Sequence, residues 1–322
     1  MSKIKFIDFC AGIGGGRIAL ENLGMECIGF SEIDKKAEIT YREIFKTDEK
    51  NFGDIMKITP NNLPNFDLMI AGFPCQSFSE IGNKNGLHDD RGHVIVGLVN
   101  ILKTKKVPYF ILENVKGLVN HDGGNTLKVI FKMLNDAGYT VQHKILNSLD
   151  FGVPQLRNRI YLVGIRKDLV NKKDFIWSNN KGRVLLKDFL IDETIIEKSE
   201  KIKSYKRLLN YVNNKVNMGK FNLNELLKKD YLIIDTRQSD LRIYENLVPT
   251  LRAGNHGILY VKNNKFHKLS GFEALLLQGF PKLIARELST KISNSDLLKQ
   301  AGNAMTINVI EMVGKSLIES IN

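Results

Sequence analysis

A glycine-rich turn near the start of the chain limits the possible folds more than any other feature. Residues 5–9 predict a short buried strand, residues 10–16 contain four glycines, and residues 17–23 have the apolar spacing of a helix. Glycines allow a ligand to approach the backbone closely, and a helix N-terminus offers free N–H groups. This order of elements is typical of the first unit of a nucleotide-binding α/β sheet.

An acidic residue follows the turn at an informative distance. A second strand is expected at residues 26–30, and Glu32 lies 20 residues after Gly12. An acidic side chain at this separation can meet the two hydroxyls of a ribose. A dinucleotide site would carry glycine or alanine in place of Arg17, so the match to a nicotinamide cofactor is incomplete. S-adenosylmethionine, which has a ribose but no pyrophosphate, is the alternative.

Strands and helices alternate as far as about residue 166. Further strands are expected at residues 67–71 and 108–112, helices at 94–102 and 126–137, and a final strand pair at 141–147 and 159–165. The alternation predicts a doubly wound α/β sheet. Glu113 follows one of these strands, at the sheet edge where such folds place their sites.

One cysteine stands where a predicted strand gives way to a loop. Cys75 lies in the sequence Phe-Pro-Cys-Gln at 73–76, and residues 81–92 have too little periodicity for a helix or strand. A cysteine in this position is well placed for nucleophilic chemistry. Most free cysteines, however, simply pack as small apolar groups. This stretch by itself leaves both interpretations open.

Composition bounds the class of protein. The chain has 322 residues, and its 43% apolar and 25% charged residues are ordinary for a globular protein. No apolar run reaches the length of a membrane span, and no signal-peptide pattern follows Met1. Three cysteines without CxxC spacing argue against disulfides and zinc, and fit a reducing cytoplasm. The net charge of +12 favours a polyanion such as nucleic acid, although lysine-rich coding bias has the same effect.

The second half of the chain has a different character. Residues 181–230 contain 12 Lys or Arg and 7 Asp or Glu, and helical spacing covers 197–212. Strands are expected at 231–235 and 258–261, and helical spacing returns at 271–277 and 306–318. These elements predict a second, smaller domain after the α/β sheet.

Six motifs resemble, in order, those of the cytosine-5 DNA methyltransferases. They are the cofactor motif at residues 6–8 and 12–15, the catalytic loop at 72–79, the glutamate motif at 113–115, the arginine motif at 155–161, the motif after the recognition region at 272–281, and the last motif at 302–304. The resemblance spans nearly the whole chain. It implies an α/β fold with a doubly wound, Rossmann-like S-adenosylmethionine-dependent methyltransferase sheet and a smaller DNA-recognition domain. It also implies a catalytic, cofactor-binding domain at 1–178 plus 290–322, a target-recognition domain at 179–265, and a connecting segment at 266–289.

The resemblance also implies a reaction and a set of catalytic residues. Cys75 would add to cytosine C6 while Glu113 shares a proton with N3, which makes C5 nucleophilic enough to accept a methyl group. Arg159 would hold the cytosine O2 and favour the thiolate, with Arg157 beside it. Because the reacting atoms are hidden inside a stacked duplex, the base must be flipped out.

Cofactor and DNA contacts follow from the same resemblance. S-adenosylmethionine, released as S-adenosylhomocysteine without a metal, would contact Phe9, Gly12, Gly14, Glu32, Ile33, Asp54, Ile55, Pro74, Asn303 and Ala304. The family usually has Phe where this chain has Cys10, so Phe9 or another apolar residue would have to compensate. DNA contacts would come from Gln76, Ser79, Arg91, Gln238, Thr250 and Arg252, with the loop after Cys75 closing over the DNA. Arg237 and Arg242 could read guanine edges or touch phosphates.

Three alternatives compete with a DNA methyltransferase. An RNA (tRNA) cytosine-5 methyltransferase would share the motifs, and a non-catalytic DNA-binding protein could keep the scaffold. A nicotinamide oxidoreductase would have no use for Cys75. For the favoured function we expect double-stranded DNA as partner, a cognate restriction endonuclease acting on the same site, no membrane, a monomeric state and a cytoplasmic location.

Overall fold

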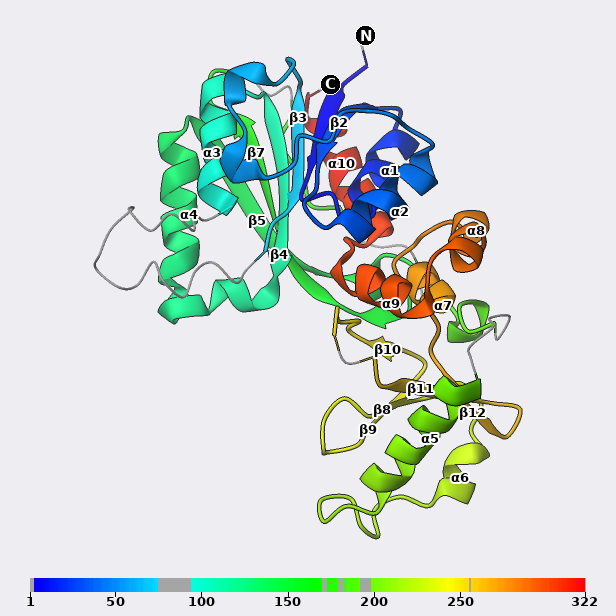
Figure 1. The fold of residues 1–322 in the computed structure, drawn as a ribbon. Coiled ribbons are helices and arrows are strands. Elements are labelled where there is room, and N and C mark those ends of the chain that lie inside the picture. The colour runs from blue at the N-terminus through cyan, green and yellow to red at the C-terminus, as the bar shows by residue number, and fades with distance from the viewer. Residues whose placement is uncertain are drawn as a thin grey trace. The chain divides into compact units, whose positions relative to one another are not determined.

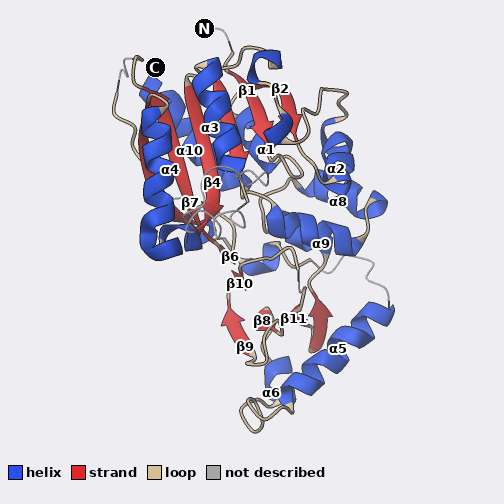
Figure 2. Cartoon of the chain, turned by 60° about the vertical axis from the view of Figure 1, so that its left-hand side comes forward, coloured by secondary structure: helices blue, strands red, loops and turns tan. Residues whose placement is uncertain are grey.

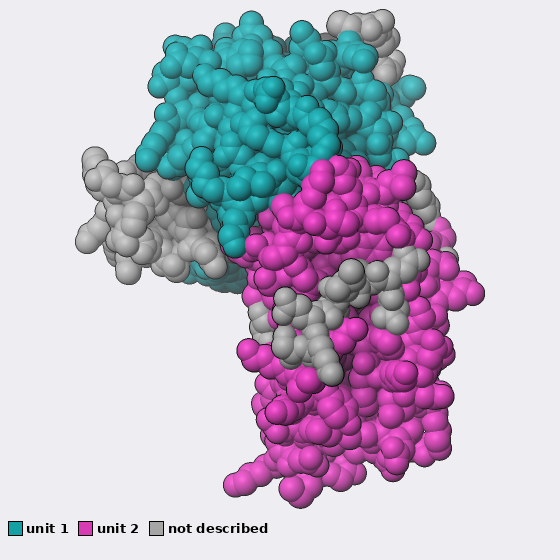
Figure 3. Space-filling model, turned by 45° about the vertical axis from the view of Figure 1, so that its right-hand side comes forward, with its two compact units in different colours: residues 1–147, 158–179, 305–322 teal, residues 148–157, 180–304 magenta. Residues whose placement is uncertain are grey.

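A computed structural model of the chain describes residues 3–74, 94–169, 173–178, 182, 184–191, 198–254 and 256–321, without the side chains of 198 and 199. The chain forms two compact units, coloured separately in Figure 3. Unit 1 comprises Met1–Asn147, Asn158–Asn179 and Met305–Asn322, and unit 2 comprises Ser148–Arg157 and Asn180–Ala304. Each unit has its own sheet.

Unit 1 is built on a six-stranded sheet with the order β2-β1-β3-β4-β7-β5. Its strands are β1 (Lys5–Phe9), β2 (Glu26–Ser31), β3 (Leu68–Gly72), β4 (Tyr109–Val115), β5 (Tyr139–Asn147) and β7 (Asn158–Arg166). The first four are parallel, and β7 runs antiparallel between β4 and β5. The predicted final strand pair corresponds to β5 and β7. The chain leaves β1 toward β2 and returns on the other side at β3, so a topological switch point lies at the ends of β1 and β3.

Helices cover both faces of this sheet (Figures 1 and 2). They are α1 (Gly15–Asn22), α2 (Lys35–Phe45), α3 (Val94–Lys105), α4 (Asn125–Asp136) and α10 (Ile307–Ile321). Side chains alternate along a strand, so Ile7 and Phe9 of β1 enter the core beneath α3 and α4. On the opposite face α10 packs on α1, where a Cβ at Gly314 would stand 2.8 Å from Leu23 Cδ1.

Unit 2 contains a four-stranded antiparallel sheet with the order β12-β11-β8-β9. The strands are β8 (Leu232–Asp235), β9 (Arg242–Glu245), β11 (Ile258–Lys262) and β12 (Lys265–Lys268), with α5 (Lys198–Val212) and α6 (Leu223–Leu227) beside them. Leu208 and Val212 of α5 pack against Leu232 and Ile234, which gives this sheet its own apolar core.

The remaining elements of unit 2 are a short parallel pair and three helices. They are β6 (Gln155–Leu156), β10 (Val248–Pro249), α7 (Gly271–Leu276), α8 (Lys282–Lys291) and α9 (Asn294–Asn303). The 3₁₀ turns of the chain include η1 (Ile55–Lys57), η2 (Pro60–Asn62), η4 (Lys116–Val119), η5 (His121–Gly124), η6 (Ser148–Asp150) and η7 (Leu186–Asp188). α7 begins with a capping box, in which the side chains of Ser270 and Glu273 satisfy each other's backbone N–H groups.

The sequence did not indicate several weakly patterned elements. The edge strands β9 and β12 are short and contain no fully buried residue, and α8 buries only Ala285 and Leu288 of its side chains. Such segments lack the strong apolar period on which sequence interpretation depends.

The predicted connecting segment and residues 290–304 lie within unit 2. A Cβ at Gly271 of α7 would clash with Leu297 of α9, so these helices pack closely together. The two units are defined by how compactly their residues pack, and not by what they do. The predicted roles of the domains therefore stay predictions. Of the helices in the described part of the chain, none combines the length and apolar character that a bilayer crossing needs.

The pairing of β4 with β7 gives a test of packing. A Cβ added at Gly164 of β7 would overlap the ring of Phe110 in β4, which is fully buried. We predict that Gly164→Ala lowers the free energy of unfolding by about 1–3 kcal/mol, the usual cost of overpacking a core. Urea unfolding measures the change. The control Gly117→Ala adds the same methyl group where the nearest atom is 3.9 Å away, and an equal loss in both variants would contradict this packing.

Candidate active site

The four glycines of the first turn are required for two different reasons. Gly12 and Gly14 have φ of +56° and +82°, in the left-handed region that favours glycine. Gly15 and Gly16 have no such φ, but a Cβ at either would stand 2.7 Å from an atom of Met305. The turn is therefore shaped partly by its own backbone and partly by the segment that leads into α10.

The space beside Gly12 is open. A Cβ built on Gly12 meets no atom of the described residues within 4 Å, in contrast to the crowded positions of Gly14, Gly15 and Gly16. The turn is closed by hydrogen bonds from the Ala11 N–H to the Ser31 carbonyl and from the Gly14 N–H to the Ala11 carbonyl. A ligand can therefore approach the backbone at Gly12 without displacing a side chain.

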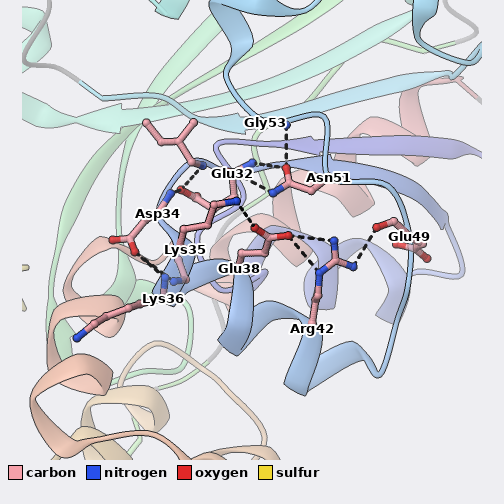
Figure 4. A network of polar contacts seen from close by, with 11 residues as sticks. Glu32, Asp34, Lys35, Lys36, Glu38, Arg42, Glu49, Asn51 and Gly53 are labelled. Atoms are coloured by element: carbon pink, nitrogen blue, oxygen red, sulfur yellow. Dashed lines mark hydrogen bonds and ion pairs between the residues drawn. The ribbon is translucent and has the colours of Figure 1, made fainter.

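Glu32 is held at the edge of the same turn by several hydrogen bonds, and Figure 4 shows those with Asn51. Its Oε2 accepts from the Gly12 N–H at 2.7 Å, and its Oε1 accepts from the N–H groups of Ile33 and Asp34 at 2.8 and 2.7 Å. The side-chain amide of Asn51 bonds both backbone polar groups of Glu32. A carboxylate offers about four acceptor positions, so about one remains for a hydroxyl group.

Apolar and acidic groups flank Glu32. Ile33 is 70% exposed, an unusual state for isoleucine, whereas Ile55 is buried. Asp54 caps η1 by accepting from the Met56 N–H at 3.0 Å, and its side chain remains 40% exposed. Pro74 is also exposed. Ile33, Asp54 and Pro74 thus have free surface for a ligand, and Ile55 does not.

Phe9 does not replace the aromatic ring that Cys10 lacks. The Phe9 side chain is fully buried and packs on Phe66, with ring centroids 6.1 Å apart. Cys10 has φ of +50°, and burial, followed by the charge of Glu32, raises the pKa of its thiol. Ile33, in contrast, keeps an exposed apolar side chain near the turn.

Glu113 and Arg159 form an ion pair at the carboxyl end of β4. Arg159 Nε lies 3.0 Å from Glu113 Oε1, and the two side chains are only 11% and 10% exposed. The pairing of β4 with β7 accounts for this contact, since Val115 and Arg159 are register partners. A buried, paired carboxylate and guanidinium are therefore held at the sheet edge.

The segment leading to Cys75 is anchored beside this pair. Gly72 is the register partner of Glu113, and the Asn114 Nδ2 donates to the Phe73 carbonyl at 3.0 Å. A Cβ at Gly72 would stand 3.6 Å from Glu113 Oε2 and 3.4 Å from the Met305 side chain. Cys75, Gln76, Ser79 and Arg91, with the predicted lid, lie outside the described residues.

A buried cluster of charged residues lies beneath the turn, and no sequence pattern indicates a function for it. Asp8 is fully buried, and neither carboxylate oxygen has a hydrogen-bond partner among the described residues. Arg17 pairs with Glu49 at 2.6 Å and with Glu21 at 2.8 Å, and its guanidinium lies 4.1 Å from the Phe45 ring centre. Arg17, which breaks the dinucleotide pattern, thus joins α1 to α2 and the residues after it. Among the described residues, no group of three or more His, Cys, Asp or Glu is arranged to hold a metal ion.

Arg157 is a structural tie within unit 2. It is 2% exposed and donates to the backbone carbonyls of Leu251, Gly302 and Ala304 at 3.1, 3.2 and 2.8 Å. Its predicted catalytic role stays a prediction, and these bonds show only a structural one. Asn303 is exposed and Ala304 is buried.

Two of the predicted DNA-contacting residues of unit 2 are exposed. Gln238 and Arg252 are exposed, whereas Thr250 donates its hydroxyl hydrogen to the Leu156 carbonyl at 2.6 Å. Arg237, which could contact guanine edges or phosphates, is buried, and its guanidinium donates to Asp235 and to the Thr250 carbonyl. Arg242 is exposed.

The sheet order, the glycine turn and Glu32 beside it define a class of protein, the α/β proteins that bind a nucleotide-like cofactor. The family model for C-5 cytosine-specific DNA methylase matches residues 4–319, and the chain belongs to that family. It is therefore a DNA (cytosine-5)-methyltransferase, and it uses the family's methyl donor, S-adenosylmethionine.

Similar proteins agree with this assignment. Type II methyltransferase M.HaeII of Haemophilus aegyptius is 37% identical, over 100% of this chain and 95% of the relative. Type II methyltransferase M.HhaI of Haemophilus parahaemolyticus is 32% identical, over 100% and 96%. Among solved structures, the methyltransferase EhMeth of Entamoeba histolytica has a TM-score of 0.72 at 16% identity and 100% coverage of both chains. A DNMT2 mutant of Spodoptera frugiperda has a TM-score of 0.67 at 19% identity, covering 98% of this chain and 100% of that one. These two structures bear on the fold alone.

The buried Asp8 predicts a dependence of stability on pH. Burial raises the pKa of its carboxyl well above the usual value of 3.8, although the charge of Arg17 opposes this. The unfolded chain loses this proton near pH 3.8, and the folded chain loses it only at a higher pH. The neutral Asp8 carboxyl therefore makes its full contribution to the free energy of unfolding below pH 3.8, and this contribution is lost as the pH rises through the folded-state pKa. Asn cannot titrate, so the free energy of unfolding of Asp8→Asn should lack this loss. Its difference from the unmodified protein should change in favour of Asp8→Asn by up to about 1.4 kcal/mol per pH unit between pH 3.8 and the raised pKa of the folded state.

Urea unfolding at several pH values from 4 upward measures this difference. The control is Asp48→Asn, which removes an exposed carboxylate. If the profiles of Asp8→Asn and the unmodified protein run parallel, Asp8 does not hold its proton in the folded state.

Proposed function

We propose that Cys75, Glu113 and Arg159 carry the methyl transfer to cytosine C5. The observation that supports this most directly is the buried Glu113–Arg159 pair beside the anchored segment that leads to Cys75. In this proposal the Cys75 thiolate adds to C6 of a flipped cytosine. The Glu113 carboxyl shares a proton with N3 and so stabilises the electrons pushed into the ring.

Arg159 has two tasks in this proposal. Its Nε orients the Glu113 carboxyl at 3.0 Å, which leaves other N–H groups of the guanidinium for the cytosine O2. A guanidinium near Cys75 would also lower the pKa of that thiol and so favour the nucleophilic thiolate. After methyl transfer, a base such as a bound water accepts the C5 proton, the C5–C6 double bond re-forms as the Cys75 thiolate leaves C6, and the shared proton returns from N3 to Glu113.

We propose that the open space beside Gly12 holds the cofactor. When bound, S-adenosylmethionine supplies an electrophilic methyl group and leaves as S-adenosylhomocysteine. Glu32 has about one free acceptor position for a ribose hydroxyl, and Ile33 has exposed apolar surface for the adenine. Asp54 can accept from the adenine amino group with its exposed carboxylate. No metal is needed in this proposal, because the sulfonium group already activates the methyl group.

We further propose that unit 2 reads the DNA through Gln238, Thr250 and Arg252. Gln238 and Arg252 are exposed, and the net charge of +12 favours association with a duplex. A cognate restriction endonuclease, a monomeric state and a cytoplasmic location, where bacterial DNA lies, belong to the same proposal.

Substitution of single cysteines tests the nucleophile. We predict that Cys75→Ser abolishes transfer of labelled methyl groups to duplex DNA, because an alcohol ionises far less readily than a thiol. Cys27→Ser should keep transfer, since the Cys27 thiol is buried, has a pKa raised to about 12 and bonds the Gly29 carbonyl. Equal loss in both variants contradicts the assignment. Transfer RNA as substrate, in parallel with DNA, separates DNA methylation from RNA methylation.

The same pair of variants can be tested without turnover. DNA that contains 5-fluorocytosine should trap a covalent adduct, because the fluorine cannot be removed as a proton. The adduct should form with Cys27→Ser and not with Cys75→Ser, and a denaturing gel detects it. Absence of any adduct despite binding of DNA and cofactor would rule out covalent catalysis by Cys75.

Glu113→Gln tests the proton partner. The amide keeps the size of the side chain but has no carboxyl proton to share, so we predict a fall in kcat of about 10²–10⁴-fold. Glu26→Gln, the same change at an exposed position of β2, should leave kcat unchanged. Steady-state methylation assays give both values, and an unchanged kcat in Glu113→Gln would remove Glu113 from the reaction.

A further inference from the structure

The loop at residues 238–240 is exposed at its tip and buried at both ends. Gln238, Ser239 and Asp240 are exposed, whereas Arg237 before them and Leu241 after them are buried. The loop joins β8 to β9 within unit 2 (Figure 1). Its two ends are held by two separate sets of polar contacts.

The first anchor is the guanidinium of Arg237. Its Nε and Nη2 donate to the two carboxylate oxygens of Asp235 at 2.7 and 2.8 Å, and its Nη1 donates to the Thr250 carbonyl at 2.7 Å. Burial acts to raise the pKa of Asp235, but hydrogen bonds and charge from Arg237 outweigh it and hold that pKa below its usual value. The pair is bidentate, which sets the direction of the side chain as well as its position.

The second anchor is Asn217, from the turn that follows α5. Asn217 is fully buried, and its Nδ2 donates to the Ser239 carbonyl at 2.7 Å and to the Tyr211 carbonyl at 2.9 Å. Its Oδ1 accepts from the Leu241 N–H at 3.2 Å. One amide thus joins the end of α5 to both sides of residue 240.

Asn214 reinforces this anchor. Its Nδ2 donates to the same Ser239 carbonyl at 2.8 Å, and its Oδ1 accepts from the N–H groups of Val216 and Asn217. A carbonyl oxygen has two lone pairs, and both have partners at Ser239. The Ser239 carbonyl therefore points toward the turn after α5, where the two asparagine side chains bind it.

We propose that Asn217 is a positioning residue that holds the 238–240 loop in the conformation in which it contacts duplex DNA. The inference rests on the proposed DNA contact of Gln238. A loop ordered before binding loses less conformational freedom on contact, and the saving appears as affinity for DNA. Asn217 touches no substrate in this proposal and acts only through the loop.

Asparagine meets the chemical demand at this position. The site needs two donors for two carbonyls and one acceptor for an N–H, which a single amide provides. Aspartate would retain the acceptor but place a carboxylate against two carbonyl oxygens. Alanine would remove the acceptor of the Leu241 N–H and one of the two donors at each of the Tyr211 and Ser239 carbonyls.

Steady-state methylation kinetics with duplex DNA test the proposal. We predict that Asn217→Ala raises KM for DNA by about tenfold, the effect of losing hydrogen bonds of ordinary strength. KM for S-adenosylmethionine should stay within about twofold, because that value does not depend on the loop. The matched control is Asn213→Ala in the same turn, whose side chain is exposed, and it should leave both constants unchanged. An equal rise in both variants, or an equal rise in both constants of Asn217→Ala, would overturn the proposal.

A double-mutant cycle separates positioning from general stability. In a Gln238→Ala background, Asn217→Ala should cost much less in KM for DNA, because the side chain that it positions is gone. A full additional tenfold rise there would contradict the role. Should Asn217→Ala not fold, Asn214→Ala removes one of the two donors at the Ser239 carbonyl and should show a smaller rise of the same kind; no rise would overturn the proposal.

Hydrogen exchange gives a readout that does not depend on activity. The Leu241 amide, bonded to Asn217 Oδ1, should exchange faster in Asn217→Ala than in the unmodified protein, and unchanged exchange would refute the anchor. If the unmodified protein methylates DNA and Asn217→Ala behaves like Asn213→Ala, only this inference fails. If the unmodified protein methylates no DNA, the proposed function itself fails, and exchange still tests the anchor.

Discussion

The close approach of Met305 to the glycines of unit 1 is the constraint on which the cofactor side of the molecule depends. Gly15 and Gly16 leave room for Met305, and Gly72 at the end of β3 lies against the same side chain. This packing joins the first turn, the third strand and the start of α10 at the switch point of the sheet. A side chain at Gly15 would meet backbone, which cannot move aside, so the return of the C-terminal helix depends on the absence of a Cβ there.

A second constraint is the antiparallel insertion of β7 beside β4. The pairing sets Arg159 opposite Val115 and so places its guanidinium on Glu113, although the two residues are far apart in the chain. A buried carboxylate is costly without a partner, and Arg159 supplies one. Strand topology thus creates the charge pair that the proposed chemistry needs.

Several features could be predicted from the sequence because they depend on local physics. The glycine turn, Glu32 at the end of β2 and the alternation of strands and helices all follow from residue spacing. Others could not, because their partners are distant in the chain. The resemblance predicts that Phe9 contacts the cofactor. Side chains alternate along β1, however, and the Phe9 side chain points into the apolar core. The sequence leaves the role of Arg237 open, and in the structure its guanidinium donates to Asp235 and to the Thr250 carbonyl.

The sequence by itself determined the family, the order of the motifs and the residue types of the proposed chemistry, since these are encoded by short spacings. Only the tertiary structure decided which of those side chains are free and which are occupied. Arg157 and Arg159 are two residues apart, yet one holds three backbone carbonyls and the other pairs with Glu113. The reason is that hydrogen-bond partners depend on distances in space, and sequence patterns record only distances along the chain.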